Sequence, residues 1–306
     1  MFTVGMSLPA VFGTDVPKGN YADLTTKGFE LSVSWRDQFQ LASKPFNYEV
    51  RFTLADYQST IDKYNNPEKK LGDDYYYEGM KVGEIWGYET EGFFTSQADI
   101  DSHAKQPYFY AGATAGQWLP GDIKFKDLNG DGVIDYGNNT VDNPGDQKII
   151  GNSEPRFIYG INLSGDWNNF FVSAFFQGVG KQDWWPGSEA SYFWGMYNRP
   201  YNDMPKSHLG NIWTEENPNT YFPRLRGYSS ELNLKQTRYL QNIAYIRMKN
   251  IQLGYTLPKS FISKLRMQNA KVYVSGENLW SWSPFYKYSK DLDVEAVRGS
   301  DRDLTE

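Results

Sequence analysis

Apolar and polar residues alternate along several stretches of this chain with the period of two that is typical of β-strands. In "FNYEVRFTLADY", residues 46–57, every second residue from Phe46 to Leu54 is apolar and the residues between them are polar or charged. The pattern predicts a strand of about ten residues with one apolar and one charged face. Further strands are predicted over residues 29–37, 156–167, 170–180, 250–258 and 271–280.

The connections between these strands predict one tight hairpin and two short helical turns. The stretch "DWNN" separates the strands 156–167 and 170–180, and a short turn of this kind joins two strands as an antiparallel hairpin. A helical period is confined to "ADIDSHAKQ" (98–106) and "PKSFISKLRM" (258–267), each enough for a turn or two. The chain is therefore expected to be all-β and antiparallel.

Two architectures accommodate such strands. In a soluble sandwich the apolar faces line a core, whereas in an outer-membrane barrel they face lipid and the polar faces line the lumen. A tilted membrane strand needs about nine to eleven residues, and globular strands average about five or six. Strand length and the charges of Glu49 and Arg51 on the polar face favour the barrel.

The spacing of the loops also favours the barrel. Outer-membrane barrels have short turns at one end and long loops at the other. In this chain "DWNN" and "LPKS" are short connectors, whereas residues 59–155 and 181–238 are long stretches rich in Gly, Tyr, Trp, Asp and Asn. Long loops of this kind are uncommon in compact soluble domains.

Composition excludes several classes of protein. The net charge is -6 and the pI about 5.2, which argues against a nucleic-acid partner. The chain has no cysteine, so disulfides and thiolate chemistry are excluded. It has no apolar run of 18 residues, and its first residues lack the basic start and apolar core of a signal peptide. Aromatic residues make up 17% of a chain whose mean hydropathy is -0.65.

The stretch "DLNGDGVIDYGNN", residues 127–139, resembles the first nine positions of a calcium loop. Position twelve is Asn138 where a bidentate glutamate is expected, so a later carboxylate would have to complete the site. The flanks are short and β-prone, which predicts a structural staple and not a helix-loop-helix sensor. An Asx and Gly turn without metal is the alternative. The predicted Ca²⁺ ligands are Asp127, Asn129, Asp131, the Val133 carbonyl, Asp135 and Asp146.

Enzymatic chemistry has little support in the sequence. The two histidines, His103 and His208, lie in loop-like contexts without metal-ligand or triad spacing, and both are expected to be solvated. No pair of carboxylates is selected as a glycosidase acid and nucleophile. The stretch "GVGKQD" lacks the spacing of a phosphate loop. The chain is predicted not to be an enzyme.

An aromatic cluster, "DWWPGSEASYFWGMYNRPYND", lies in the second long loop region. Aromatic side chains on an exposed loop could stack on sugar faces or contact a partner protein, because they are enriched at interfaces. They could also pack the loop on itself or sit in an interface girdle, and this structural role is the favoured one. Arg224 and Arg226 are placed at the mouth of the barrel as a guess. The candidates for ligand or lid contact are Trp184, Trp185, Trp194 and Tyr197.

Five motifs in order give the chain a family resemblance over most of residues 7–295. It resembles the C-terminal half of SusC/RagA transporters, TonB-dependent proteins of the outer membrane of Bacteroidota-like bacteria. The resemblance implies a 22-stranded barrel around a plug, a capping SusD-like lipoprotein, and import of glycans or peptides driven by the TonB complex. The motifs are "VGEIWGYETEGFF", "PGDIKFKDLNGDGVID", "GDQKIIGNSEPRFIYGINLSGDWNNFFVSAFFQGVGKQD", "YIRMKNIQLGYTLP" and "AKVYVSGENLW".

The sequence also departs from the family pattern. Signal peptide, TonB-contacting segment, plug and final aromatic strand have no counterpart, and about ten strands are visible, roughly half of the family's barrel. Residues 1–306 are therefore expected to be a partial barrel domain, a fragment with contacts to outer-membrane lipid. The acidic residue that the family has after "NGDGVID" corresponds to Asp146. The competing hypothesis is a secreted, calcium-stapled β-sandwich that binds carbohydrate.

Overall fold

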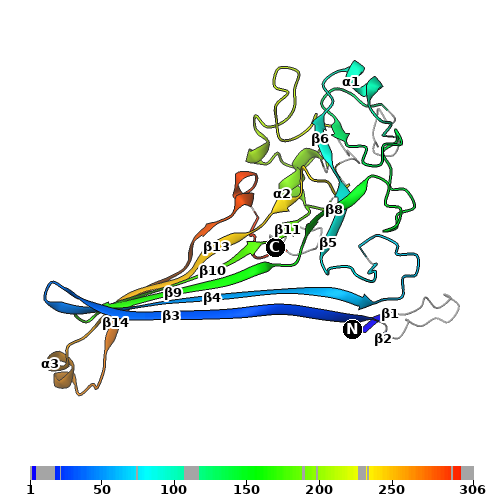
Figure 1. Cartoon of the computed structure of the whole chain (residues 1–306). Coiled ribbons are helices and arrows are strands. Elements are labelled where there is room, and N and C mark those ends of the chain that lie inside the picture. Colours follow the sequence, from blue (N-terminus) through cyan, green and yellow to red (C-terminus); the bar gives the residue numbers. More distant parts are fainter. Residues whose placement is uncertain are drawn as a thin grey trace, which may run out of the picture.

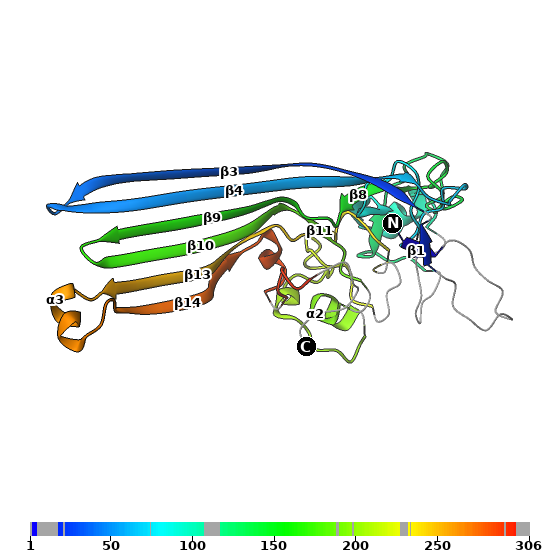
Figure 2. The same ribbon diagram turned by 90° about the horizontal axis from the view of Figure 1, so that it is seen from below.

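The computed structural model describes a long sheet with a folded mass of loops standing on one end of it (Figure 1). It describes residues 2–4, 18–20, 22–73, 75–106, 117–187, 190–197, 199–226, 232, 234–290 and 292–297. Seen from below, the strands run side by side as an open, gently curved wall (Figure 2).

The wall is a six-stranded antiparallel sheet in the order β14-β13-β10-β9-β4-β3. The predicted hairpin between β9 and β10 is confirmed, with Trp167 paired to Phe170 across the turn. Six strands are fewer than the ten or so expected, because other β-prone stretches form short pairs among the loops. The six are β3 (Asp23–Leu41), β4 (Lys44–Lys63), β9 (Arg156–Trp167), β10 (Phe170–Lys181), β13 (Tyr245–Thr256) and β14 (Lys271–Trp282).

Strand register places apolar residues from each of the six strands on one face. Val50 pairs with Leu163, which pairs with Ala174, and Val172 in turn pairs with Leu253. The other face is polar, and its residues include Glu49, Arg51, Asn162, Ser164, Ser173 and Gln252. The predicted alternation is confirmed.

The apolar face is exposed. Trp35 on β3 is 59% exposed and Val274 on β14 is 77% exposed, and no second sheet covers them in the described part of the chain. A soluble sandwich would bury this face in a core. The sandwich hypothesis is therefore wrong, and the face is suited to lipid.

Aromatic side chains gather where the short turns join the strands. One row of paired residues runs Phe46–Trp167–Phe170–Tyr255 across β4, β9, β10 and β13. The indole N–H of Trp167 donates to the carbonyl of Leu41 at 2.9 Å, which ties two hairpins together. Aromatic girdles at the membrane interface are typical of outer-membrane barrels.

At the other end stands the loop domain, which we define as the described parts of residues 64–155, 182–244 and 283–297. Its strands pair as β5 with β8, β6 with β7 and β11 with β12, while β1 (Phe2–Val4) and β2 (Lys18–Asn20) pair separately. The loop-domain strands are β5 (Glu84–Tyr88), β6 (Thr90–Phe93), β7 (Ile123–Phe125), β8 (Gln147–Asn152), β11 (Asp183–Trp184) and β12 (Gln241–Asn242).

The helices are short. The two predicted helical turns are confirmed as α1 in the loop domain and α3 in the β13–β14 turn. No helix in the described ranges is long and apolar enough to cross a membrane. The helices are α1 (Gln97–Ser102), α2 (Ser191–Trp194) and α3 (Lys259–Ile262), with 3-10 turns η2 (Gly195–Tyr197), η3 (Lys206–His208), η5 (Ser263–Leu265) and η6 (Pro284–Lys287).

The loop domain has its own hydrophobic core, which lies on the polar side of the sheet. Tyr245 and Val179, which share the polar face of the sheet, are buried in this core. A second, smaller cluster surrounds Ile61 near the end of β4, whose backbone bonds Met80 and Gly79 at 2.8 Å. The stretches 59–155 and 181–238 thus carry secondary structure and burial of their own.

Candidate functional site

The polar face of the sheet and the loop domain above its end together form the candidate functional region. On the sheet, the Arg36 guanidinium lies 3.0 Å from the Glu49 carboxylate, and the Asn47 amide donates to Asp166 at 2.8 Å. Arg36 is exposed and Glu49 is half-buried, so water screens the ion pair and it contributes little to stability. They can instead offer charges and hydrogen bonds to a polar ligand.

A buried ion pair lies inside the loop domain. Arg226 lies 2.9 Å from Asp122, and both side chains are buried. Burial raises the pKa of Asp122 to about 6, although the Leu119 amide and the two arginines near it, Arg226 and Arg224, oppose the rise. The guanidinium of Arg224 lies 4.9 Å above the Trp213 ring. Both arginines, expected at the mouth of the barrel, therefore make contacts within the loop domain.

The four aromatic candidates for ligand or lid contact lie in the interior of the loop domain. Trp184, Trp194 and Tyr197 are each 2% exposed and Trp185 is 7% exposed. The Trp194 indole donates to the Pro186 carbonyl at 2.8 Å. Such burial supports the packing role that the sequence favours. Their contact with a ligand or a lid stays a prediction.

The calcium-like loop is closed by its own hydrogen bonds. The Asp127 carboxylate accepts from the Gly130 and Gly132 amides at 2.6 and 2.9 Å, and these bonds, the Gly132 bond most of all, hold the pKa of Asp127 below its usual range. Both glycines have φ near +80°, the left-handed region that suits a tight turn. Asp131 and Asp135 accept from the Val133 and Gly137 amides in the same way.

Asp146 joins the two ends of this loop. It is completely buried, and its carboxylate accepts from the Leu128 amide at 2.7 Å and the Asp135 amide at 2.9 Å. Its own amide donates to the Asp135 carbonyl. Within the described residues no group of three or more His, Cys, Asp or Glu side chains is placed to hold a metal. The looped-out Asp146 reaches the loop as expected, and calcium binding stays a prediction.

One histidine differs from expectation. His208 was expected to be solvated, but it is 1% exposed, and its Nε2 donates to the Phe193 carbonyl at 2.9 Å. Its ring packs 4.1 Å from that of Phe222. Burial lowers the pKa of His208, so the ring is neutral at pH 7. The prediction failed because a polar residue in an irregular segment carries no periodic sign of burial.

Sequence reasoning also missed a pocket of about 400 Å³ on the loop domain. Tyr75, Tyr88 and Tyr136 line it together with the Asp73 and Lys235 side chains, which form an ion pair. Burial raises the pKa of Tyr88 to about 12, so its hydroxyl is a permanent hydrogen-bond donor. These residues are up to 162 positions apart, which leaves no local signal to find them.

Comparison with known proteins defines the class. No family model matches the sequence. Two curated proteins of Formosa agariphila, named TonB-dependent receptor P3 and TonB-dependent receptor P26, are each 26% identical to it over 294 and 293 residues. The matches cover 91% and 92% of this chain but 26% and 27% of the relatives. The chain thus spans about a quarter of the length of these relatives.

Solved structures share its fold. The structure of the RagAB peptide transporter matches with a TM-score of 0.66 at 19% identity, over 99% of this chain and 30% of that one. The RagAB peptide importer in the open-open state matches with a TM-score of 0.64 at 18% identity, over 98% of this chain and 29% of that one.

The sheet, its exposed apolar face and these matches define a segment of an outer-membrane barrel wall. The chain is related to the TonB-dependent receptors, and its predicted resemblance to the SusC/RagA type is confirmed. TonB-dependent receptors are outer-membrane proteins, and the predicted location in the outer membrane is confirmed with the class.

Proposed function

We propose that this chain forms part of the wall and outer loops of a TonB-dependent importer. The polar sheet face lines the path of the solute, and the loop domain stands at the outer mouth. Energy for import comes from the TonB complex. The observation that carries the proposal is the six-stranded sheet, exposed and apolar on one face and polar on the other, with a folded loop domain on the polar side.

The proposed substrate is an oligomeric nutrient, a glycan or a peptide. Solved neighbours are named as peptide importers, which supports an oligomer as cargo. Arg36, Glu49, Arg51 and Asn162 offer hydrogen bonds of both polarities along the polar face, which suits the repeated amides of a peptide or the hydroxyls of a glycan.

The proposed partner is a SusD-like surface lipoprotein that covers the loop domain. The two-component name RagAB supports a paired assembly in the neighbours. In this chain the pocket lined by Tyr75 and Tyr136, which are 47% and 49% exposed, offers aromatic surface on the outer side. Exposed tyrosines of this kind are favoured in protein interfaces.

A growth assay tests the transport function. We expect deletion of the gene to abolish growth on one class of oligomer, oligosaccharides or oligopeptides, while growth on the matching monomers is unchanged. Complementation with the wild-type gene should restore growth. Equal growth of mutant and parent on every oligomer, with the protein absent from the outer-membrane fraction, would overturn the proposal.

A further inference from the structure

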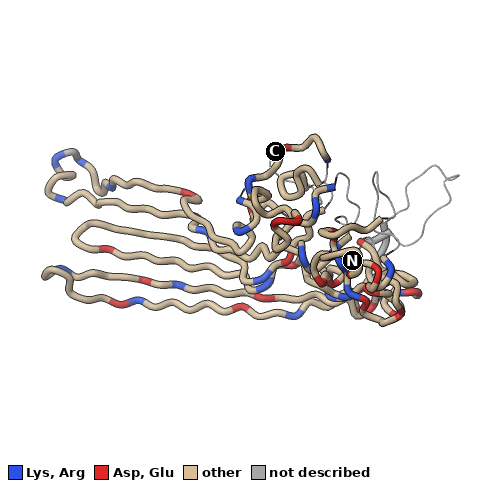
Figure 3. Tube along the Cα trace, turned by 90° about the horizontal axis from the view of Figure 1, so that it is seen from above, with Lys and Arg blue, Asp and Glu red and all other residues tan. Residues whose placement is uncertain are grey.

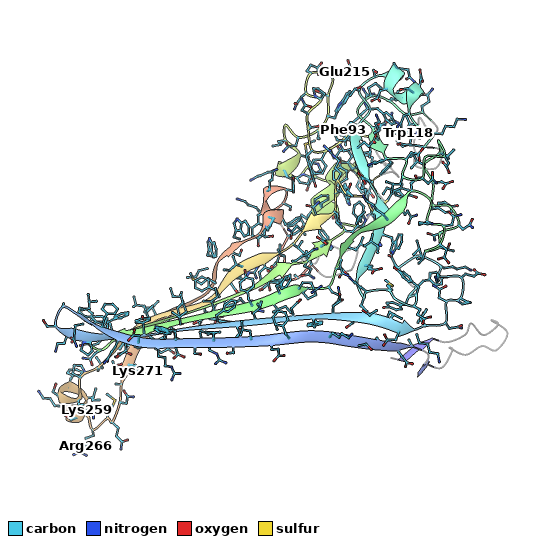
Figure 4. The ribbon with its side chains drawn as sticks, in the orientation of Figure 1. Phe93, Trp118, Glu215, Lys259, Arg266 and Lys271 are labelled. Carbon is cyan, nitrogen blue, oxygen red and sulfur yellow. The ribbon has the colours of Figure 1, made fainter. Side chains whose placement is uncertain are left out.

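The turn between β13 and β14 differs from the other short turns of the wall. From Leu257 to Lys271 the sequence contains four cations and no acidic residue: Lys259, Lys264, Arg266 and Lys271. The turn folds as α3 and η5 and projects to one side of the sheet, below its left-hand end (Figure 4). The charge view shows the same blue cluster at this end of the wall (Figure 3).

Three of these cations are fully available to a partner. Lys259, Lys264 and Arg266 are exposed, and none of them forms an ion pair with any residue that the structure describes. Lys271 differs, because its ammonium lies 5.2 Å from the Phe171 ring, on the polar side of the sheet. The three free cations therefore form one basic surface, which we call the basic turn.

The basic turn lies on the lipid side of the wall. The loop domain stands on the polar side, and α3 projects from the opposite side at the other end (Figure 1). The apolar face leads directly into the turn, with Tyr255 paired to Val272 and Leu253 to Val274. Within the turn, Phe261 is 54% exposed and Met267 is 42% exposed.

The depth of the basic turn in the membrane follows from the row of paired aromatic residues that crosses β4, β9, β10 and β13. Trp167, Phe170 and Tyr255 lie beside the turns, and such girdles mark the boundary between hydrocarbon and headgroups. Residues just beyond Thr256 are therefore at the level of the headgroups. Because short turns of these barrels are periplasmic, the leaflet is the periplasmic one. Asp37, an acid on the same face, lies on β3 at the far edge of the sheet.

From this placement we propose that the basic turn binds anionic phospholipid headgroups of the periplasmic leaflet. Lys259, Lys264 and Arg266 would pair with the phosphates, while Phe261 and Met267 enter the acyl boundary. Basic segments at an anionic membrane surface are attracted in this way, and their long side chains can reach the headgroup level while the stems stay in apolar surroundings. The inference rests on the outer-membrane location and is independent of the cargo that is imported.

The test compares lipid binding by protein extracted from its own outer membrane. Native mass spectrometry would follow titration of the detergent-solubilised protein with phosphatidylglycerol and, separately, phosphatidylcholine. We expect phosphatidylglycerol to bind more tightly, and the triple variant Lys259→Gln, Lys264→Gln, Arg266→Gln to lose about fivefold in affinity per cation. The preference should shrink in 0.5 M salt, roughly as expected for screening of exposed charges.

A matched control carries the same charge change at the other end of the wall: Lys63→Gln, Lys206→Gln and Lys290→Gln, all at exposed positions. It should bind phosphatidylglycerol as the wild type does. Equal binding by the triple variant and the wild type, or an equal loss in the control, would overturn the proposal. Displacement of the lipid by millimolar glycerol phosphate would also overturn it, because a soluble phosphoester would then be the ligand.

Discussion

At the scale of single residues, the loop domain depends on polar groups that the surrounding packing buries. His208 is neutral because burial lowers its pKa, and Asp122 has a raised pKa because burial outweighs its arginine partner. Asp146 accepts two backbone hydrogen bonds without a counter-charge in the described contacts. The stability of the loop domain therefore depends on pH through His208 and Asp122, and on two backbone hydrogen bonds through the Asp146 side chain.

The first prediction concerns His208 and acid. Since its pKa is lower in the folded state than the ordinary value of about 6.5, the unfolded chain binds more protons below that pH. The contribution of His208 to the stability of the loop domain should therefore fall as pH drops from 7.5 to 5, whereas the raised pKa of Asp122 acts in the opposite direction. The variant His208→Phe keeps the ring packing and should lose that contribution to the pH dependence, at a cost of about 1–3 kcal/mol at neutral pH from the unpaired Phe193 carbonyl.

Denaturant titrations followed by tryptophan emission measure this effect, since Trp194 lies beside Phe193 in the same core. The comparison is the difference in unfolding free energy between pH 7.5 and pH 5. An identical difference in the wild type and in His208→Phe would contradict the assignment of acid sensitivity to this ring.

A second prediction separates the hydrogen-bonded staple from a calcium site. Asp146→Ala leaves the Leu128 and Asp135 amides without their acceptor, and should cost about 2–4 kcal/mol with or without calcium. Asp131→Ala removes an exposed carboxylate, and should lower protease resistance of the loop in calcium if an ion binds there. Limited proteolysis with calcium and with chelator gives the answer. Equal protease resistance of the wild-type loop with calcium and with chelator would show that the loop binds no calcium.

At the scale of secondary-structure elements, the strands were predictable and the loop domain was not. Residues 46–57 carry a period of two, and the pattern gives both the strand and its lipid face without knowledge of any partner. The core of the loop domain combines Ile123, on the short strand β7, with Phe222 and Tyr239, which come from separate irregular segments. Their burial depends on long-range contacts, and no local pattern records them.

The two faces of β9 give a third prediction. Leu163 and Asn162 are neighbours in sequence and lie on the apolar and polar faces respectively. Leu163→Arg places a charge against lipid and should cost about 2–4 kcal/mol, whereas Asn162→Arg should be tolerated by the polar side. Urea titration of folded protein in lipid vesicles measures both. Similar losses in the two variants would show that the faces are assigned wrongly.

A fourth prediction concerns the segment 292–297, which is held against β13 by Arg247. Its guanidinium bonds Asp293 with both terminal nitrogens and Glu295 at 2.7 Å, while Lys249 approaches Glu295 at 2.8 Å. Arg247→Lys keeps the charge but loses the paired geometry, and should release the segment at a cost of about 1–3 kcal/mol. Hydrogen exchange at 292–297 reports release. Lys249→Gln is the control, with a smaller expected effect.

At the scale of the whole molecule, the described sheet ends in two unpaired edges, β3 and β14. Unpaired strand edges and an exposed apolar face promote association with other chains. We therefore expect the 306-residue chain to self-associate in buffer and to disperse in detergent, as measured by light scattering. A monodisperse particle near 35.3 kDa in plain buffer would contradict a membrane wall.

The length of β4 has a geometric consequence. Leu54 is still on the lipid face, whereas Ile61, seven positions further along the same unbroken strand, is buried among the residues of the second cluster. A strand rises about 3.3 Å per residue and cannot stretch, so this stretch acts as a rigid spacer of roughly 23 Å. It sets the height at which the loop domain stands above the hydrocarbon. Inserting two residues there would raise that height by about 7 Å and keep every later side chain of the strand on its present face. Inserting one residue would move those side chains to the opposite face of the sheet.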